Sequence, residues 1–212
     1  MFKDMRARFC KQDSAIYFSH LDLNRGVHRA SRRSGIPFWS TGGFSPHPYC
    51  IFAQPLSLGF ESEGELFDFR VLEGEPFDPE DLKKAFPASL QILEIYEPVR
   101  SFKEIAWADY RVELKTDASA EAIQTAFEGT LTVLKKTKRS EKEVELREFI
   151  SSVTAEQTEP GLVTLSASIA AGNDRSLSPI YMAEGLGNAG LNVELHRVRR
   201  LCFRTMDGEV FK

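Results

Sequence analysis

The chain has 212 residues, of which 42% are hydrophobic and 16 are Phe, and its formal net charge is -4. This is enough apolar material for one large core or two small ones. No stretch approaches the roughly 20 apolar residues of a membrane-spanning helix, and the charged N-terminus lacks the apolar segment of a signal peptide. The three cysteines, Cys10, Cys50 and Cys202, show neither a disulfide framework nor a thiolate metal spacing. We therefore expect a globular cytoplasmic protein with no membrane partner.

The charge is unevenly distributed along the chain. Residues 1–50 hold eight Lys/Arg and three Asp/Glu, whereas residues 51–100 hold four and eleven. A basic face could thus lie beside an acidic one, so the overall charge says little about whether an anionic partner binds.

The first half of the chain predicts the element order βαββαβ. The expected strands are 5–11 with an extension at 15–18, 36–40, 49–53, 65–71 and 91–96. One helix is expected to begin after Ser19 and end at Gly35, and a second to begin at Asp78-Pro79 and run to about Phe86. This order is the split motif of the ferredoxin-like fold.

The second half follows a polar linker at 97–104 and repeats a similar order with an extra strand. The expected strands are 107–115, 131–135, 144–155, 161–169 and 192–203, the expected helices are 118–127 and 178–189, and 135–145 is expected as a charged hairpin or loop. The sequence therefore predicts an α+β protein of two tandem ferredoxin-like domains, 1–98 and 105–212. Each is expected to have an antiparallel sheet with its helices on one face.

Candidate site residues are densest between Ser19 and Tyr49. At the start of the first helix, free N-H groups and the positive end of the helix dipole favour an anion beside Ser19 and Asp22. The same field disfavours a protonated His20, leaving a neutral imidazole suited to proton transfer. The alternative is that Ser19 and Asp22 only cap the helix.

A loop rich in glycine and proline follows this helix. Gly42 and Gly43 would let the backbone approach a ligand closely, Thr41-Gly42-Gly43 is expected as a turn with positive φ, and Ser45 adds a hydroxyl. Prolines on both sides of His47 hold it in an extended, stiff segment. The alternative is a rigid turn with a buried histidine.

Four arginines lie on the side of the first helix that faces away from its apolar stripe. They are Arg25, Arg29, Arg32 and Arg33, with His28 at their edge. Guanidinium groups bind phosphates bidentately and release counterions from nucleic acid. The alternatives are a solvated face, or pairing with the acidic residues Glu61, Glu63, Glu65 and Asp68.

Other chemistries use the same stretch. His20 and His47 could act as acid and base on an RNA 2'-hydroxyl, with arginines holding the phosphate. The histidines and Asp22 have no metal-ligand spacing such as HExxH, so we expect no metal. The aromatic residues of this stretch, Phe38, Trp39, Phe44, Tyr49 and Phe52, could stack on bases or belong to the core.

Several segments together resemble the radical SAM-linked protein family, a bacterial domain of unknown function. The matching segments are 6–11 (RARFCK), 18–23 (FSHLDL), 29–37 (RASRRSGIP), 43–48 (GFSPHP), 55–62 (PLSLGFES) and 142–150 (KEVELREFI). The resemblance covers nearly the whole chain. It implies a radical SAM partner that uses S-adenosylmethionine and a 4Fe-4S cluster, and a setting close to ribosome or RNA-processing functions. The chain itself lacks the CxxxCxxC cluster motif, so it resembles the stand-alone form, and we expect no cofactor of its own.

Three functions remain open from the sequence. The leading hypothesis is an accessory protein that binds RNA or another anionic substrate through the Ser19–Tyr49 face and presents it to a radical SAM enzyme. The second is a metal-independent RNA-cleaving or RNA-modifying enzyme that uses His20 and His47. The third is a protein-docking scaffold.

Overall fold

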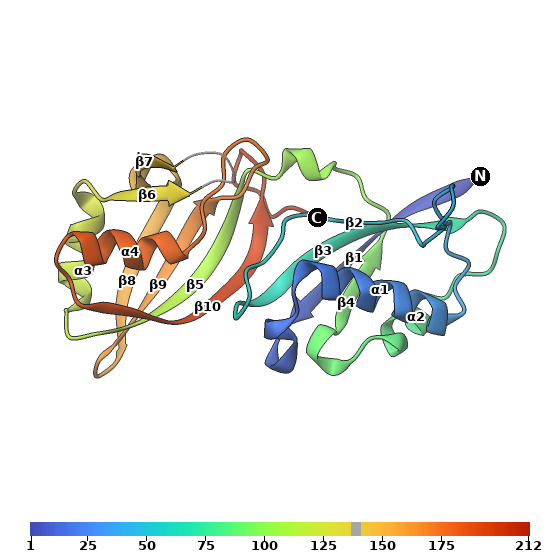
Figure 1. The fold of residues 1–212 in the computed structure, drawn as a ribbon, viewed down its shortest axis with the longest axis horizontal. Coiled ribbons are helices and arrows are strands. Elements are labelled where there is room, and N and C mark those ends of the chain that lie inside the picture. Colours follow the sequence, from blue (N-terminus) through green and yellow to red (C-terminus); the bar gives the residue numbers. More distant parts are fainter. Residues whose placement is uncertain (137–140) are drawn as a thin grey trace. The chain divides into compact units, whose positions relative to one another are not determined.

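The computed structural model describes residues 1–136 and 141–212, which form four α-helices and mostly antiparallel sheets (Figure 1). The prediction of an α+β protein is therefore confirmed. The chain divides into two compact units: unit 1 is Met1–Phe102 with Lys212, and unit 2 is Lys103–Phe211. In the described part of the chain, no helix is both long and apolar enough to cross a membrane.

Unit 1 contains four strands and two helices. They are β1 (Phe2–Lys11), α1 (His20–Ser34), β2 (Cys50–Phe52), β3 (Glu61–Leu72), α2 (Pro79–Ala85) and β4 (Ile92–Tyr96). The strands lie in the order β4-β1-β3-β2, and each neighbouring pair is antiparallel. Short 3-10 helices are found at Asp13–Tyr17, Ala88–Leu90 and Phe102–Glu104.

The core of unit 1 lies between one face of this sheet and its helices, which cover the same face in Figure 1. Alternate residues of β1, such as Ala7 and Phe9, face this core and are fully buried. Leu23 and Val27 of α1 pack against them because residues four apart lie on one side of a helix.

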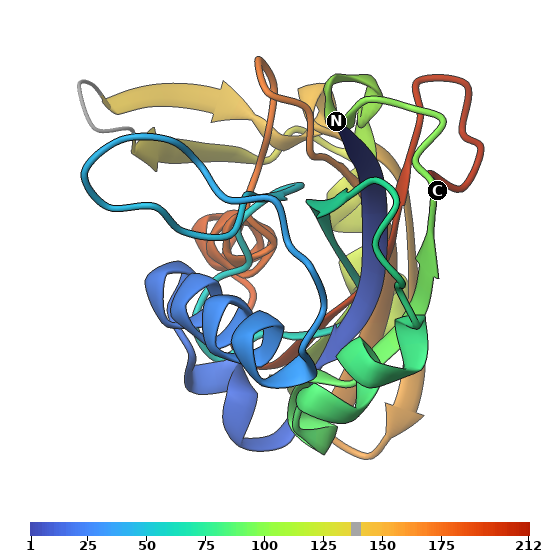
Figure 2. The same ribbon diagram turned by 90° about the vertical axis from the view of Figure 1, so that its right-hand side faces the viewer.

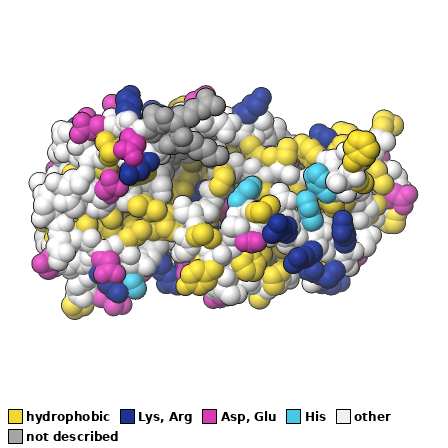
Figure 3. All heavy atoms as spheres, in the orientation of Figure 1, with side chains coloured by type: hydrophobic (Ala, Val, Ile, Leu, Met, Phe, Trp, Pro, Cys, Tyr) yellow, Lys and Arg dark blue, Asp and Glu magenta, His cyan; other side chains and the backbone are white. Residues whose placement is uncertain are grey.

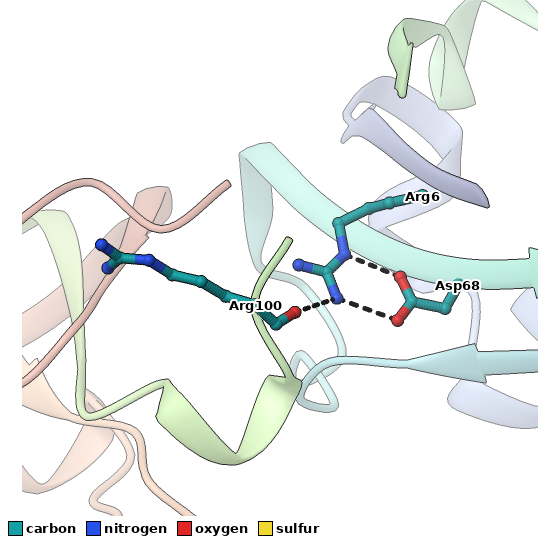
Figure 4. A network of polar contacts seen from close by, with 3 residues as sticks. All are labelled: Arg6, Asp68 and Arg100. Atoms are coloured by element: carbon teal, nitrogen blue, oxygen red, sulfur yellow. Dashed lines mark hydrogen bonds and ion pairs between the residues drawn. The ribbon is translucent and has the colours of Figure 1, made fainter. Parts of the chain in front are cut away.

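The other alternate residues of β1 point to the opposite face of the sheet. One of them, Arg6, is completely buried there. Its Nε and Nη2 donate to the two carboxylate oxygens of Asp68 in β3, at 2.7 and 2.9 Å (Figure 4). Nη2 also donates to the Arg100 carbonyl at 2.9 Å, and the guanidinium lies 4.1 Å from the Phe102 ring centroid. The segment after β4 is thereby held against the sheet by one arginine.

Unit 2 contains six strands and two helices. They are β5 (Trp107–Thr116), α3 (Ala120–Glu128), β6 (Thr132–Lys136), β7 (Glu141–Glu145), β8 (Ile150–Glu159), β9 (Leu162–Ala170), α4 (Ile180–Asn188) and β10 (Val193–Arg204). The order β10-β5-β9-β8 forms an antiparallel sheet, and β6 and β7 form a separate hairpin.

Two predicted strands of unit 1 are wrong. The extension at 15–18 belongs to the 3-10 helix Asp13–Tyr17, which begins with Asp13 at φ 51. The segment 36–40 makes only isolated bridges, from Phe38 to Val71 and from Ser40 to Pro48. A continuous ladder is interrupted there because Pro37 has no N-H to donate.

One predicted strand of unit 2, 144–155, is also wrong as a single element. It is divided between β7 and β8 by the 3-10 helix Leu146–Glu148, in which Phe149 N donates to Leu146 O at 2.9 Å. Both of these side chains are buried. Alternation of apolar residues continues across such a turn, so the pattern does not reveal it. The expected hairpin at 135–145 is present as β6 and β7, and residues 137–140 lie outside the described part.

Candidate functional site

The start of α1 is closed by a capping box. Ser19 Oγ accepts from Asp22 N at 3.2 Å, and Asp22 Oδ2 accepts from Ser19 N at 3.2 Å and from Ser19 Oγ at 2.6 Å. These hydrogen bonds hold the pKa of the Asp22 carboxyl below its usual range. The carboxylate already lies at the positive end of the helix, so an anion would compete with it there.

The arginines of α1 face away from the core, as the sequence predicts. Arg25, Arg29, Arg32 and Arg33 are exposed while Leu23, Val27 and Ala30 are buried. Figure 3 shows Lys and Arg side chains gathered with His side chains over α1.

The four arginines differ in what they contact. Arg33 Nη2 donates to the Ala85 carbonyl of α2 at 2.7 Å, which ties it to the packing of the two helices. Arg25 Nη1 lies 3.9 Å from Asp22 Oδ1, with both side chains more than half exposed. Among the residues that the structure describes, Arg29 and Arg32 make no ion pair, and Asp68 is bound by Arg6 instead.

The loop between α1 and β2 closes on itself. Thr41 N donates to His47 O at 2.9 Å, and Ser40 bridges to Pro48 beside it. Gly43 supplies the positive φ of the turn, at 102°, whereas Gly42 does not adopt one. Figure 2 shows this segment leaving the end of α1 and turning back above the helix.

His47 is exposed and its ring is oriented by this loop. Its Nδ1 lies 3.1 Å from the Ser45 carbonyl and 3.2 Å from Thr41 Oγ1. With a proton on Nδ1, the ring donates to Ser45 O, and Nε2 is left for a ligand. Phe44 is fully exposed in the same loop. The alternative of a rigid turn that buries this histidine is therefore wrong, because His47 is exposed.

The return of the loop places His47 beside His28 of α1. Their ring centroids are 5.2 Å apart with an angle of 37° between the planes. Burial lowers the pKa of the His28 imidazole, and the charges of His47 and Arg32 lower it further. Positive charges on His28, His47 and Arg32 therefore repel one another, and a bound anion would reduce that repulsion.

His20 has a different neighbour. Its ring meets that of Phe52 edge to face, with centroids 5.2 Å apart. The structure thus gives each predicted catalytic histidine its own ring partner: Phe52 for His20 and His28 for His47.

The sequence did not single out His28 as a partner of His47. The sequence does indicate that His28 and Arg32 lie on one side of the helix, because they are four residues apart. Nothing local indicates that a loop nineteen residues further along returns to that side. Within residues 1–136 and 141–212, no group of three or more His, Cys, Asp or Glu is placed to hold a metal ion.

The fold and this surface define an α+β protein with a basic, histidine-bearing face on one helix and the loop after it. Over residues 5–179 the chain matches the family described as "Uncharacterized protein conserved in bacteria (DUF2344)", and it belongs to that family. The family match confirms a bacterial domain of uncharacterized function. The link to radical SAM enzymes is not part of the description and stays a prediction. No match was found among curated proteins.

Two solved structures match this chain at low sequence identity. One is a chain in the crystal structure of a Cbf5-Nop10-Gar1 complex, with a TM-score of 0.55 and 9% identity over 94% of this chain and 48% of that chain. The present chain therefore spans about half the length of that relative. The other is an unknown protein from Galdieria sulphuraria, with a TM-score of 0.28 and 11% identity over 92% of this chain and 98% of that one. That score is too low to support a structural argument.

Proposed function

We propose that this protein binds RNA, or another anionic substrate, through the face formed by α1 and the loop 41–48. The observation that carries the proposal is the meeting of His28 and His47, 5.2 Å apart, beside the exposed arginines of α1. Arginine supplies bidentate contacts to phosphate, and an imidazole with a free Nε2 supplies a further hydrogen bond. The face lies within residues 1–50, which hold eight Lys/Arg and three Asp/Glu, although the whole chain is acidic.

The exposed Phe44 favours single-stranded nucleic acid over a small anion. A fully exposed aromatic ring contributes nothing to the core, and it lies in the same loop as His47. Stacking of a base on such a ring supplies about 1–3 kcal/mol and requires an unpaired base.

Binding of single-stranded RNA by this protein should weaken steeply as salt is raised. Each phosphate that a basic side chain neutralises releases counterions, and contacts from three arginines give a log-log slope of about -2. Fluorescence anisotropy with a labelled RNA oligonucleotide at several salt concentrations measures this slope. Binding that is absent, or that does not change with salt, contradicts the proposal.

Binding should also strengthen as the pH falls through the range in which histidine titrates. The free protein holds the pKa of His28 below its ordinary value of about 6.5. A bound phosphate favours the protonated imidazole, so binding takes up a proton and affinity rises at low pH. The variant His28→Asn with His47→Asn should show a flatter pH profile by several-fold. An unchanged profile would exclude the histidines from the contact.

We also propose that the bound substrate is presented to a radical SAM enzyme. This part rests on the sequence resemblance, and the S-adenosylmethionine and the 4Fe-4S cluster would belong to that partner. Co-purification of a cluster-containing protein with RNA supports it. Co-purification without RNA would favour the protein-docking scaffold, in which the acidic segment 61–81 is the contact surface.

Cleavage of RNA is the outcome that would favour the enzyme hypothesis. Fragments that form in EDTA and disappear with His20→Ala would assign catalysis to His20. We place binding first because the ring of His20 packs on Phe52 whereas His47 adjoins His28.

Each unit is proposed to be a variant of the ferredoxin-like fold. In support, unit 1 has the chain order β1-α1-β2-β3-α2-β4 with strand order β4-β1-β3-β2. Unit 2 follows the same order when β8 takes the second strand position, with the β6-β7 hairpin as an insertion.

A further inference from the structure

The sheet of unit 2 borders a cavity of about 600 Å³ that has no part in the proposed function. Its floor consists of short hydroxyl side chains on two neighbouring strands. Ser152 of β8 lies opposite Ser168 of β9, and Thr154 lies opposite Ser166. The β9 residue between the two serines, Ala167, is buried on the other side of the sheet. The floor is therefore polar, and it can both donate and accept hydrogen bonds.

An ion pair stands at the edge of this floor. Asp109 of β5 lies directly opposite Ser168, and its Oδ2 accepts from Arg204 Nε at 2.6 Å. Cys202 Sγ also donates to Oδ2, at 3.6 Å, and Arg204 Nη1 donates to the Gly208 carbonyl at 2.8 Å. In the described chain these hydrogen bonds to Asp109 all end on Oδ2. The other oxygen, Oδ1, is left as a fixed acceptor.

An indole ring forms part of the wall. Trp107 is the cross-strand neighbour of Arg204 and is half-buried. Arg175 Cζ lies 4.8 Å from its ring centroid, but Arg175 lines the adjacent cavity and not this one. Trp107 borders both cavities, so an apolar ring surface meets the hydroxyl floor.

The charges of the lining side chains determine which kind of ligand the cavity can bind. Among the described residues, the charged side chains of the lining are Asp109, Arg204 and Asp207, and the one cation of these three, Arg204, is already paired with Asp109. A phosphate or carboxylate would meet an excess of negative charge, while a purely apolar ligand would leave the hydroxyls without partners. A neutral molecule with several hydroxyl groups and one flat face avoids this repulsion and also gives the hydroxyls of the floor hydrogen-bond partners.

We infer that this cavity binds a neutral sugar ring with neighbouring hydroxyls, supplied by a saccharide or by the ribose of a nucleoside. Sugar hydroxyls donate to Asp109 Oδ1 and exchange hydrogen bonds with Ser152 and Ser168, and the less polar side of the ring packs on Trp107. Arg204 is a positioning residue that holds the carboxylate in place. The site lies wholly within unit 2 and is independent of the RNA-binding face proposed for unit 1.

Titration of the ¹⁵N-labelled protein, with both units present, with maltotriose and, separately, with uridine tests this inference. The chain has two tryptophans, so the indole N-H signal of Trp107 reports on the cavity and that of Trp39 is an internal control. We expect a saturable shift of the Trp107 signal alone. A response to maltotriose only indicates a saccharide, and a response to uridine only, or to both, indicates a site that accepts ribose. No response to either overturns the inference.

Two variants of the cavity test whether the shift of the Trp107 signal comes from binding in this cavity and not from binding elsewhere on the protein. Asp109→Asn should weaken binding about tenfold or more, because a hydrogen bond to a charged group is lost. Since Asp109 also holds Arg204, Ser152→Leu is the second variant: this exposed residue can be enlarged without entering the core, and the larger side chain occupies the floor. Ser57→Leu, in unit 1, is its matched control and should bind normally. Unchanged affinity in both cavity variants contradicts the assignment.

Discussion

Replacing Arg6 by alanine should lower the free energy of unfolding by about 3–5 kcal/mol. The guanidinium is completely buried and is held by Asp68, by the Arg100 carbonyl and by the Phe102 ring. The substitution leaves the Asp68 carboxylate without its cation in a partly buried position. Urea denaturation followed by circular dichroism measures the loss.

The pKa of Asp68 shows why breaking the pair costs so much. Burial, together with the charge of Asp4, raises the pKa of this carboxyl by more than the hydrogen bonds and charge of Arg6 lower it. The carboxylate is thus kept ionised at an electrostatic cost even with its partner present. Replacement of both residues, Arg6→Leu with Asp68→Leu, removes that cost and should destabilise less than Arg6→Ala alone.

The neighbouring rung of the same ladder supplies the matched control. Asp4 pairs with Arg70 across β1 and β3, two residues from Arg6 and Asp68 and with the charges reversed. Arg70 Nε donates to Asp4 Oδ1 at 2.8 Å, but the Asp4 side chain is 53% exposed. Asp4→Asn should therefore change stability by less than about 1 kcal/mol. Equal losses in Asp4→Asn and Arg6→Ala would show that burial of the guanidinium is not the cause.

The triple variant Arg25→Glu, Arg29→Glu and Arg32→Glu should reduce RNA affinity at low salt by about a hundredfold or more. Three phosphate contacts become three repulsions, and the salt slope should fall by about 2. Arg33 is left intact because its hydrogen bond to Ala85 O joins α1 to α2. Glutamate is nearly as good a helix former as arginine, so α1 should persist.

A control with the same change in net charge separates the site from the overall charge. Lys115, Lys142 and Arg147 are exposed residues of unit 2, and their replacement by Glu alters the charge by the same amount. Affinity should fall far less in this control. Similar losses in both triple variants would indicate non-specific attraction rather than a binding face on α1.

Local signals in the sequence predicted the helix boundaries well. Ser19 and Asp22 form the expected capping box, Gly35 ends α1 in the left-handed conformation, and Asp78 with Pro79 begins α2. These signals work because a cap is a hydrogen bond between residues three or fewer apart. Alternation likewise located most strands and failed at 144–155, where a short turn keeps the apolar period.

The sequence by itself determined that α1 is a capped helix with a buried stripe and exposed arginines, because that depends on spacing along one helix. Only the tertiary structure decided that His47 lies beside His28, that Arg6 meets Asp68, and that the serines of β8 and β9 share one floor. Each of these contacts depends on the register of strands or on the return of a loop. Register and return are set by packing between distant segments, which no local pattern encodes.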